Sequence, residues 1–304
     1  VNDGTISSIY DKLEKREVLA SKANEFLLWE DEPNNWGAWD VNHFYRETTP
    51  QKAKLISSKI IHQSDISATL AQKFKIGNST IEQKITISEN SKLIKFENVV
   101  DWKEEHKMLR VSAQPDIYAS KASYEIQYGT LQRATHSNTS WDAAKFEVAA
   151  QRFADLSQPD YGFAILNDCK YGHYVKENVM SLNLLRSPKD TDKQADQHSH
   201  KFTFCYYPHQ GSLIESDTLQ LAHNLNSPLM QFPVSGLPEN RQRSFYNILG
   251  KNVKLEVIKK AEDGNGIIIR MYETAGTNTE INFQTAENWY KFIETDMLEN
   301  TLDQ

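Results

Sequence analysis

The sequence is poor in cysteine and has no long apolar run. Its two cysteines, Cys169 and Cys205, are too few for the disulfide framework of a small secreted domain, and both lie in apolar or aromatic runs typical of a core. No stretch reaches the ~18 apolar residues of a membrane span, and the first residues lack the basic and apolar regions of a signal peptide. These absences favour a reducing cytoplasm and no membrane partner.

Positive charge is also in deficit. The chain has 34 Lys and Arg against 41 Asp and Glu, which gives a net charge of -7. Binding by phosphate neutralisation needs clustered Lys and Arg, so we expect no nucleic-acid partner. The 304 residues, 39% of them hydrophobic, have an ordinary globular composition and are enough for one large domain or two.

Helix patterns are scarce, and period-2 alternation dominates the first two hundred residues. One short helix is predicted over residues 217–224, with Ser216 or Asp217 as its cap. Apolar residues at alternate positions on both sides of Gly77-Asn78 predict a hairpin. Further predicted strands are 94–100, 123–131, 146–153, 162–168, 181–185, 201–207, 252–259, 266–272 and 280–283. This pattern predicts an all-β fold: a large antiparallel sandwich over residues 1–225, a linker over 226–243 and a smaller β-sandwich over 244–304.

Motifs that carry chemistry on their own are weak in this chain. His198 and His200 lie in an acidic run and could ligate a transition metal, but exposed histidines in such a run are more often only solvated, so we predict no metal site. A retaining glycosidase needs two carboxylates about 5 Å apart, a distance that a sequence does not supply. The carboxylates that remain open are Asp31, Glu32, Asp40, Asp142 and Asp168.

Two segments place tryptophans among carboxylates and amides, at residues 29–40 and 133–142. Sugars are commonly bound by stacking on aromatic rings, while acidic and amide side chains take the hydroxyl groups. A structural role at the edge of a sandwich is the alternative for both segments. The candidate sugar contacts are Trp36, Trp39, Asp40, Asn138, Trp141 and Asp142.

Several runs together resemble the C-terminal β-sandwich region of family 38 glycoside hydrolases, the α-mannosidases, and in particular their cytosolic and vacuolar branch. The most extensive is ADLSQPDYGFAILNDCKYG at residues 154–172. The others, in the family's order, are DGTISSIYDK (3–12), WGAWD (36–40), YEIQYG (124–129), NTSWDAAKFE (138–147), LRSP (185–188) and YPHQG (207–211). The resemblance covers nearly the whole chain and implies a galactose-mutarotase-like supersandwich followed by a smaller sandwich.

The resemblance implies a retaining exo-α-mannosidase in which a divalent metal, zinc or cobalt, binds the sugar. The family's nucleophile and metal ligands lie in an upstream barrel and helical bundle, and no segment here matches their motifs. We therefore expect no catalytic residue and no metal ligand in this chain, and both of its ends look cut. The segments 36–40 and 138–142 are expected to help wall the sugar site, although the family commonly has Asp where this chain has Gly37.

The implied partners are mannosides or oligosaccharides and the N-terminal catalytic domain, and a homo-oligomer stays open. One alternative is a free-standing carbohydrate-binding module that uses Trp29, Trp36 and Trp39 as a stacking platform. The other is a structural module for subunit contact, for which a large exposed apolar face would be the sign.

Overall fold

The computed structural model describes residues 3–233, 235–236, 243–250, 252–286, 289 and 291–302. Contacts divide the chain into two units. The first comprises residues up to 126 and 131–228, and the second comprises residues 127–130 and those from 229 onward. The predicted domain boundaries stay a prediction, and residues 234 and 237–242 of the predicted linker lie outside the described residues.

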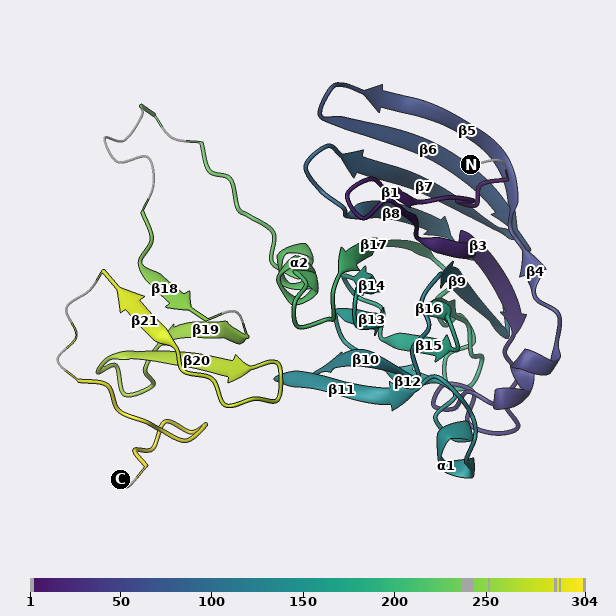
Figure 1. Ribbon diagram of the computed structural model, residues 1–304. Coiled ribbons are helices and arrows are strands. Elements are labelled where there is room, and N and C mark those ends of the chain that lie inside the picture. The colour runs from purple at the N-terminus through teal and green to yellow at the C-terminus, as the bar shows by residue number, and fades with distance from the viewer. Residues whose placement is uncertain are drawn as a thin grey trace. The chain divides into compact units, whose positions relative to one another are not determined.

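Two antiparallel sheets form the first unit (Figure 1). The larger has the strand order β11-β10-β13-β14-β17-β8-β7-β6-β5, and the smaller has the order β12-β15-β16-β9-β3-β4. The bounds in the larger sheet are β5 Lys54–Gln63, β6 Ser67–Ile76, β7 Ser79–Ser88, β8 Ile94–Asp101, β10 Lys121–Ile126, β11 Gly129–Ala134, β13 Phe153–Ser157, β14 Tyr161–Asn167 and β17 Ser199–Gln210. Those in the smaller sheet are β3 Leu19–Glu30, β4 Gln51–Lys52, β9 Lys107–Pro115, β12 Val148–Ala149, β15 Gly172–Lys176 and β16 Val179–Arg186.

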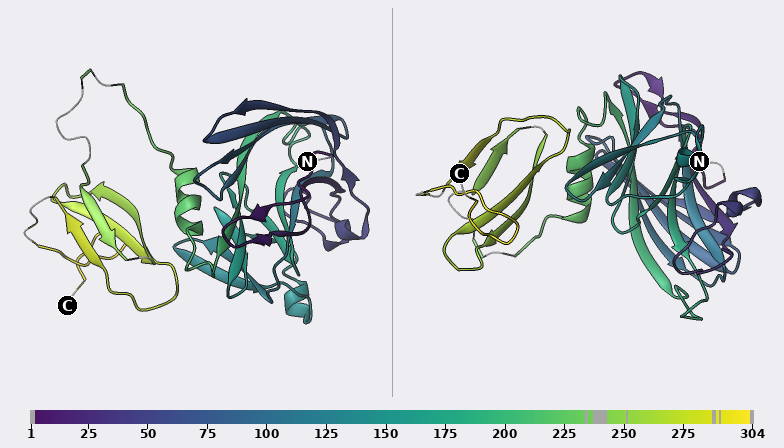
Figure 2. Two further views of the ribbon diagram at one scale, coloured as in Figure 1. Left: turned by 45° about the horizontal axis from the view of Figure 1, so that its top comes forward. Right: turned by 90° about the horizontal axis from the view of Figure 1, so that it is seen from below.

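Side-chain alternation builds the core between the two sheets. On β7, Ile81 and Ile85 are buried, whereas Glu82 and Lys84 face outward. β6 and β7 pair in register through Ile76 and Ser79, which confirms the predicted hairpin around Gly77-Asn78. Figure 2 shows these strands side by side in the larger sheet. The all-β antiparallel fold predicted from the sequence is therefore confirmed.

A ladder of buried amides crosses the interior between the sheets. Gln83 Nε2 on β7 donates to Asn98 Oδ1 on β8 at 2.9 Å and to Asn24 Oδ1 on β3 at 3.0 Å. Asn24 Nδ2 donates back to Gln83 Oε1 at 2.8 Å, and the Asn24 N–H donates to the Tyr206 hydroxyl at 3.3 Å. Asn24 has φ of 58° at a register shift of β3, so a bulge aims its amide inward.

The helix α2, Thr218–Asn226, covers the face of β13 and β14 that points away from the core between the two sheets (Figure 1). Its N-cap residue is Asp217, but the Ser216 hydroxyl, not the Asp217 side chain, accepts the Thr218 N–H at 3.2 Å. Cys205 is buried beneath this helix, as expected of a core residue. The same expectation is wrong for Cys169, which is exposed because it lies in the turn after β14, with its Sγ 3.0 Å from Asp168 Oδ1.

Two predicted strands differ from the structure. Residues 123–131 form a hairpin of β10 and β11, because Tyr128, a residue without turn character, has φ of 55° between them. Residues 146–153 do not form one strand either. The chain crosses there from β12 in the smaller sheet to β13 in the larger one.

From residue 229 onward, the named strands of the described residues form two antiparallel pairs. β18 Tyr246–Leu249 pairs with β21 Asn282–Thr285, and β19 Val253–Lys260 pairs with β20 Ile267–Glu273. The Phe283 ring stacks with Tyr246 at 6.1 Å between centroids and meets Phe292 edge-on at 6.2 Å.

A short pair of β1 Tyr10–Asp11 and β2 Arg16–Glu17 completes the strands of the first unit. No helix in the described residues is long and apolar enough to cross a membrane.

Candidate functional site

The segment after β3 is held by one arginine. Arg186, at the end of β16, places Nε 2.6 Å from Asp31 Oδ2 and Nη2 3.0 Å from Asp31 Oδ1. Arg186 Nη2 also donates to the carbonyl oxygens of Gly37 at 3.1 Å and Asp40 at 2.7 Å. Asp31 is buried. A single guanidinium therefore joins a buried carboxylate to the backbone of residues 36–40, which we call the first loop.

Two tryptophans of the first loop project into solvent. Trp36 and Trp39 are 70% and 69% exposed, and their ring centroids lie 6.3 Å apart with the planes 77° to each other. The N–H groups of Trp39 and Asp40 both donate to the Trp36 carbonyl, at 2.8 and 2.9 Å. Trp36 itself has φ of 59°, in the left-handed region. Trp29 is different: its ring meets Tyr45 edge-on at 5.3 Å between centroids, so it does not extend a solvent-facing platform.

Residues 138–142, which we call the second loop, lead into the short helix α1, Ser140–Ala143, and overlap its first three residues. The Thr139 hydroxyl accepts the Asp142 N–H at 3.1 Å, which caps the start of the helix, and it donates to Asp142 Oδ2 at 2.8 Å. Asp142 Oδ2 also lies 3.7 Å from His136 Nδ1. Trp141 is 79% exposed. In this loop Trp141 is free to meet a ligand, whereas the carboxylate of Asp142 is used by the fold.

A cluster of charged and aromatic side chains connects the two loops. The first loop continues into a 3-10 helix, η1 His43–Glu47, and the second continues to Glu147. The Tyr45 hydroxyl donates to Glu147 Oε1, and Arg46 and Arg110 place guanidinium nitrogens 3.2 and 2.7 Å from the same oxygen. Arg110 Nε also donates to Ser181 Oγ at 2.9 Å. The cluster holds both loops against the outer face of the smaller sheet.

Burial sets the protonation of this cluster. Burial raises the pKa of Tyr45 to about 12, so its hydroxyl stays protonated and donates. Burial alone disfavours the charge on Arg110, but the Glu147 carboxylate beside it holds the pKa of the guanidinium above its usual value. The cluster therefore pairs two permanently charged guanidinium groups with one carboxylate, an arrangement that can support the loops.

Asn138 faces a separate hollow of about 640 Å³ in the first unit. Its N–H donates to His136 Nδ1 at 3.4 Å. The hollow is lined by polar and aromatic side chains, among them Arg16, Tyr118, His136 and Asn178. Tyr118 is 95% exposed. Asn138 and Trp141 thus lie on one loop, but the loop also contributes to a hollow that sequence reasoning did not anticipate.

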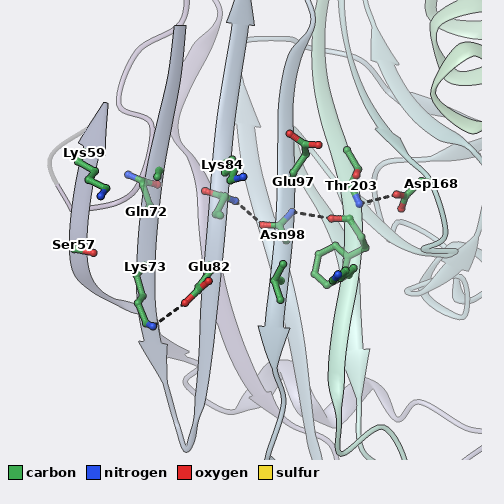
Figure 3. A pocket seen from close by; sticks show the side chains of 15 residues that line it. Ser57, Lys59, Gln72, Lys73, Glu82, Lys84, Glu97, Asn98, Asp168 and Thr203 are labelled. Atoms are coloured by element: carbon green, nitrogen blue, oxygen red, sulfur yellow. Dashed lines mark hydrogen bonds and ion pairs between the residues drawn. The ribbon is translucent and has the colours of Figure 1, made fainter. Parts of the chain in front are cut away.

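A groove of about 840 Å³ crosses the outward face of β5, β6, β7, β8 and β17 (Figure 3). Lys73 and Glu82 pair across it at 2.8 Å, and Asp168 Oδ2 accepts the Thr203 N–H at 2.9 Å. None of the six candidate sugar contacts is among the described residues that line it.

The structure sorts the carboxylates that the sequence left open. Three of them already have partners within the fold. Asp31 pairs with Arg186, Asp142 accepts the Thr139 hydroxyl, and Asp168 accepts the Thr203 N–H. Glu32 and Asp40 are exposed. Sequence reasoning missed the role of Arg186 as well as the cluster around Glu147. A lone arginine that ends the apolar strand β16 was the available signal for the first.

Family models match two parts of the chain. Residues 1–194 match the "Glycosyl hydrolases family 38 C-terminal domain", and residues 252–304 match the "Glycosyl hydrolases family 38 C-terminal beta sandwich domain". The two matches follow each other along the chain, and the first includes both candidate loops.

Relatives and solved structures agree with these matches. The chain is 36% identical over 303 residues to Alpha-mannosidase 2C1 of Mus musculus, and 37% identical over 299 residues to Alpha-mannosidase G of Dictyostelium discoideum. These alignments cover 97% and 94% of this chain, but 29% and 27% of the relatives. The chain thus spans less than a third of their length. A glycosyl hydrolase family 38 protein from Enterococcus faecalis has the same fold, with a TM-score of 0.81 and 13% identity over 97% of this chain and 39% of that one.

Proposed function

Because the chain belongs to family 38 of the glycosyl hydrolases and matches its C-terminal domains, we propose that it is the non-catalytic C-terminal part of a retaining, metal-dependent exo-α-mannosidase. The longer enzyme would hydrolyse terminal α-linked mannose from mannosides and oligosaccharides. The observation that carries this proposal is the pair of consecutive family matches, supported by relatives that are named alpha-mannosidases.

In this proposal, the first loop helps to wall the sugar site. Trp36 and Trp39 expose apolar ring faces on which the C–H face of a sugar can stack. The exposed Asp40 carboxylate can accept a hydrogen bond from a sugar hydroxyl. Arg186 acts as a positioning residue, because it binds the carbonyl oxygens of Gly37 and Asp40 and is itself fixed by Asp31. Trp141 and Asn138 of the second loop are the further candidate contacts.

The zinc or cobalt ion of the longer enzyme would supply a Lewis acid at the sugar. The candidate loops do not fit such an ion, because the first loop offers the Asp40 carboxylate and the second offers only Asp142, which is engaged in the helix cap. A metal of this kind needs three or four protein ligands. We therefore assign it to the catalytic domain and attribute to the two loops only binding and positioning of the sugar.

The partners in this proposal are the N-terminal catalytic domain and a mannoside. We also propose the cytoplasm as the compartment, which cell fractionation of the full-length protein would test. A homo-oligomer is the proposed assembly, which sedimentation of the full-length protein would test.

An activity assay separates the catalytic from the supporting role. The purified 304-residue chain is incubated with an aryl α-mannoside and added zinc or cobalt, alone and together with the separately produced upstream part of its gene product. We expect no turnover by the chain alone and turnover by the combined parts. Turnover by the chain alone would show that catalysis resides here and would overturn the proposal.

The exposure of Trp36 and Trp39 also favours a second function, a carbohydrate-binding module. That function predicts saturable binding of mannose or methyl α-mannoside by the isolated chain. Calorimetry and tryptophan fluorescence at millimolar sugar would detect it. Heat of binding that disappears in Trp36→Ala and Trp39→Ala would establish the binding module, whereas the absence of any heat leaves the supporting role.

A further inference from the structure

Three potential metal ligands converge at the start of β17. Asp196, His198 and His200 each place one donor atom within 4.8 Å of the donor atoms of the other two. The rings of His198 and His200 stack with centroids 3.9 Å apart and planes at 26°. Among the described residues, this is the one group in which three His, Cys, Asp or Glu side chains lie close enough together to share a metal ion. From the His-x-His spacing alone we predicted no metal site, and the structure adds the convergence with Asp196 that changes this interpretation.

The hydrogen bonds of the two rings decide which nitrogens are free. His198 Nδ1 lies 3.0 Å from the Ser199 carbonyl oxygen, and His200 Nε2 lies 2.7 Å from the Asp196 carbonyl oxygen. A carbonyl oxygen only accepts, so these two nitrogens carry the protons. The lone pairs therefore remain on His198 Nε2 and His200 Nδ1. Histidines that bind metals typically donate their other ring N–H to a carbonyl or carboxylate in this way.

The backbone holds the three residues in place. His200 pairs with Val100 in the register of β17 and β8, so it is fixed by the larger sheet. The Trp102 N–H donates to the His198 carbonyl at 3.2 Å, and the His198 N–H donates to the Asp196 carbonyl at 2.8 Å. Asp196 has φ of 59°, which turns the chain so that its carboxylate comes near the two rings. Two positions apart on an extended chain, His198 and His200 face the same side.

We propose that Asp196, His198 and His200 bind one divalent transition-metal ion of the zinc, nickel and copper class. Two imidazole nitrogens and one carboxylate oxygen suit these ions, whereas hard cations such as Mg²⁺ prefer oxygen ligands alone. Water would fill the remaining coordination positions, because Asp196 and His198 are exposed. The three ligands are not residues of the Trp36 and Trp141 loops, and the proposal does not depend on the proposed glycosidase function.

Calorimetric titration of the untagged 304-residue chain with ZnCl₂, NiCl₂ and MgCl₂ tests the proposal. We expect one zinc or nickel site per chain and no heat with magnesium. His198→Ala and His200→Ala should each weaken binding roughly 10-fold to 100-fold or more, since even groups that only orient a ligand contribute that much. The matched control is His62→Ala, which removes an exposed histidine of β5 and should leave binding unchanged.

Copper provides a readout on the unaltered chain. The electron paramagnetic resonance spectrum of one equivalent of Cu²⁺ should show coupling to two imidazole nitrogens, and to one in His198→Ala. Asp196→Asn keeps both rings and should weaken binding without loss of the nitrogen coupling. Equal affinity in the wild-type chain and in His198→Ala, an equal loss in His62→Ala, or a copper spectrum without nitrogen coupling would each overturn the proposal.

Discussion

Arg186 and Asp31, 155 residues apart in the chain, form a two-point ion pair at the ends of β16 and β3. β9 lies between these two strands in the smaller sheet, so the pair spans a neighbouring strand. The same guanidinium binds two carbonyl oxygens of the first loop. Arg186 therefore ties the backbone that carries Trp36 and Trp39 to a distant strand.

Replacing Asp31 by Asn should destabilise the chain and loosen the first loop. The change leaves the largely buried Arg186 without its charge partner, and loss of one member of a buried pair costs about 3 kcal/mol. Urea unfolding measures the free energy, and acrylamide quenching of tryptophan fluorescence measures the loop. The exposed neighbour provides the control, because Glu32→Gln should change neither quantity. An unchanged unfolding curve for Asp31→Asn would contradict the role of the pair.

Replacing Glu147 by Gln should be the more severe change. It removes the carboxylate that pairs with both Arg46 and Arg110, and Arg110 is almost fully buried. We expect a loss of about 3–5 kcal/mol in the free energy of unfolding. The control is Glu97→Gln, which breaks the surface pair with Lys95 and should cost less than about 1 kcal/mol. Similar losses in both variants would show that the cluster does not hold the loops.

His173 should make the stability of the chain depend on acid. Burial, with a smaller contribution from the charge of Arg110, lowers the pKa of His173 from 6.5 to about 3. Its Nε2 has no partner in the described residues, and its ring meets that of Tyr124 edge-on at 6.4 Å between centroids. The unfolded chain thus binds a proton that the folded chain does not, so stability is full above pH 6.5 and falls as the pH drops toward 3.

Chemical denaturation between pH 7 and pH 4 measures this effect. His173 should contribute up to ~1.4 kcal/mol per pH unit to the decline. His173→Leu should reduce the slope of the free energy of unfolding against pH by an amount that corresponds to about one proton. His62→Leu, at an exposed strand position, should leave the slope unchanged. An identical slope in the wild-type chain and in His173→Leu would show that other groups cause the decline.

In the longer enzyme, the exposed tryptophans should matter for substrate and not for stability. Trp36→Ala and Trp39→Ala remove rings that are mostly solvent-exposed, so the unfolding midpoint should not move. Loss of an aromatic contact worth about 1 kcal/mol should raise KM for a mannoside about fivefold. Tyr10→Ala removes an exposed ring elsewhere and is the control. KM values equal to that of the wild type in both tryptophan variants would remove the first loop from the sugar site.

The strands with clean alternation were predictable, because one buried face imposes a period of two on the sequence. β7 and β8 are of this kind. β3 was not predicted, because its burial pattern is interrupted by the bulge at Asn24. A bulge depends on the partner strand, which local sequence does not contain. Tyr128 likewise forms a turn without a turn residue.

The candidate loops were chosen because their tryptophans lie among polar residues, and Trp36, Trp39 and Trp141 are exposed in the structure. Their contact with a sugar stays a prediction. Their supports were not predictable. Glu147 meets Arg110 and Tyr45 across the sheet, and Arg186 meets Asp31 from a distant strand. Such pairings depend on the order of the strands in the sheet, so a local sequence pattern does not predict them.

The amide ladder between the two sheets has a consequence for how the sandwich is aligned. An apolar interface alone would tolerate sliding of one sheet over the other. A shift of β3 by one residue would turn Asn24 away from the interior and leave Gln83 buried without that partner. Each unpaired group would cost about 1–3 kcal/mol. Asn24, Gln83 and Asn98 thus favour one alignment of the two sheets over the alternatives. They contribute more to the specificity of the fold than to its free energy of unfolding.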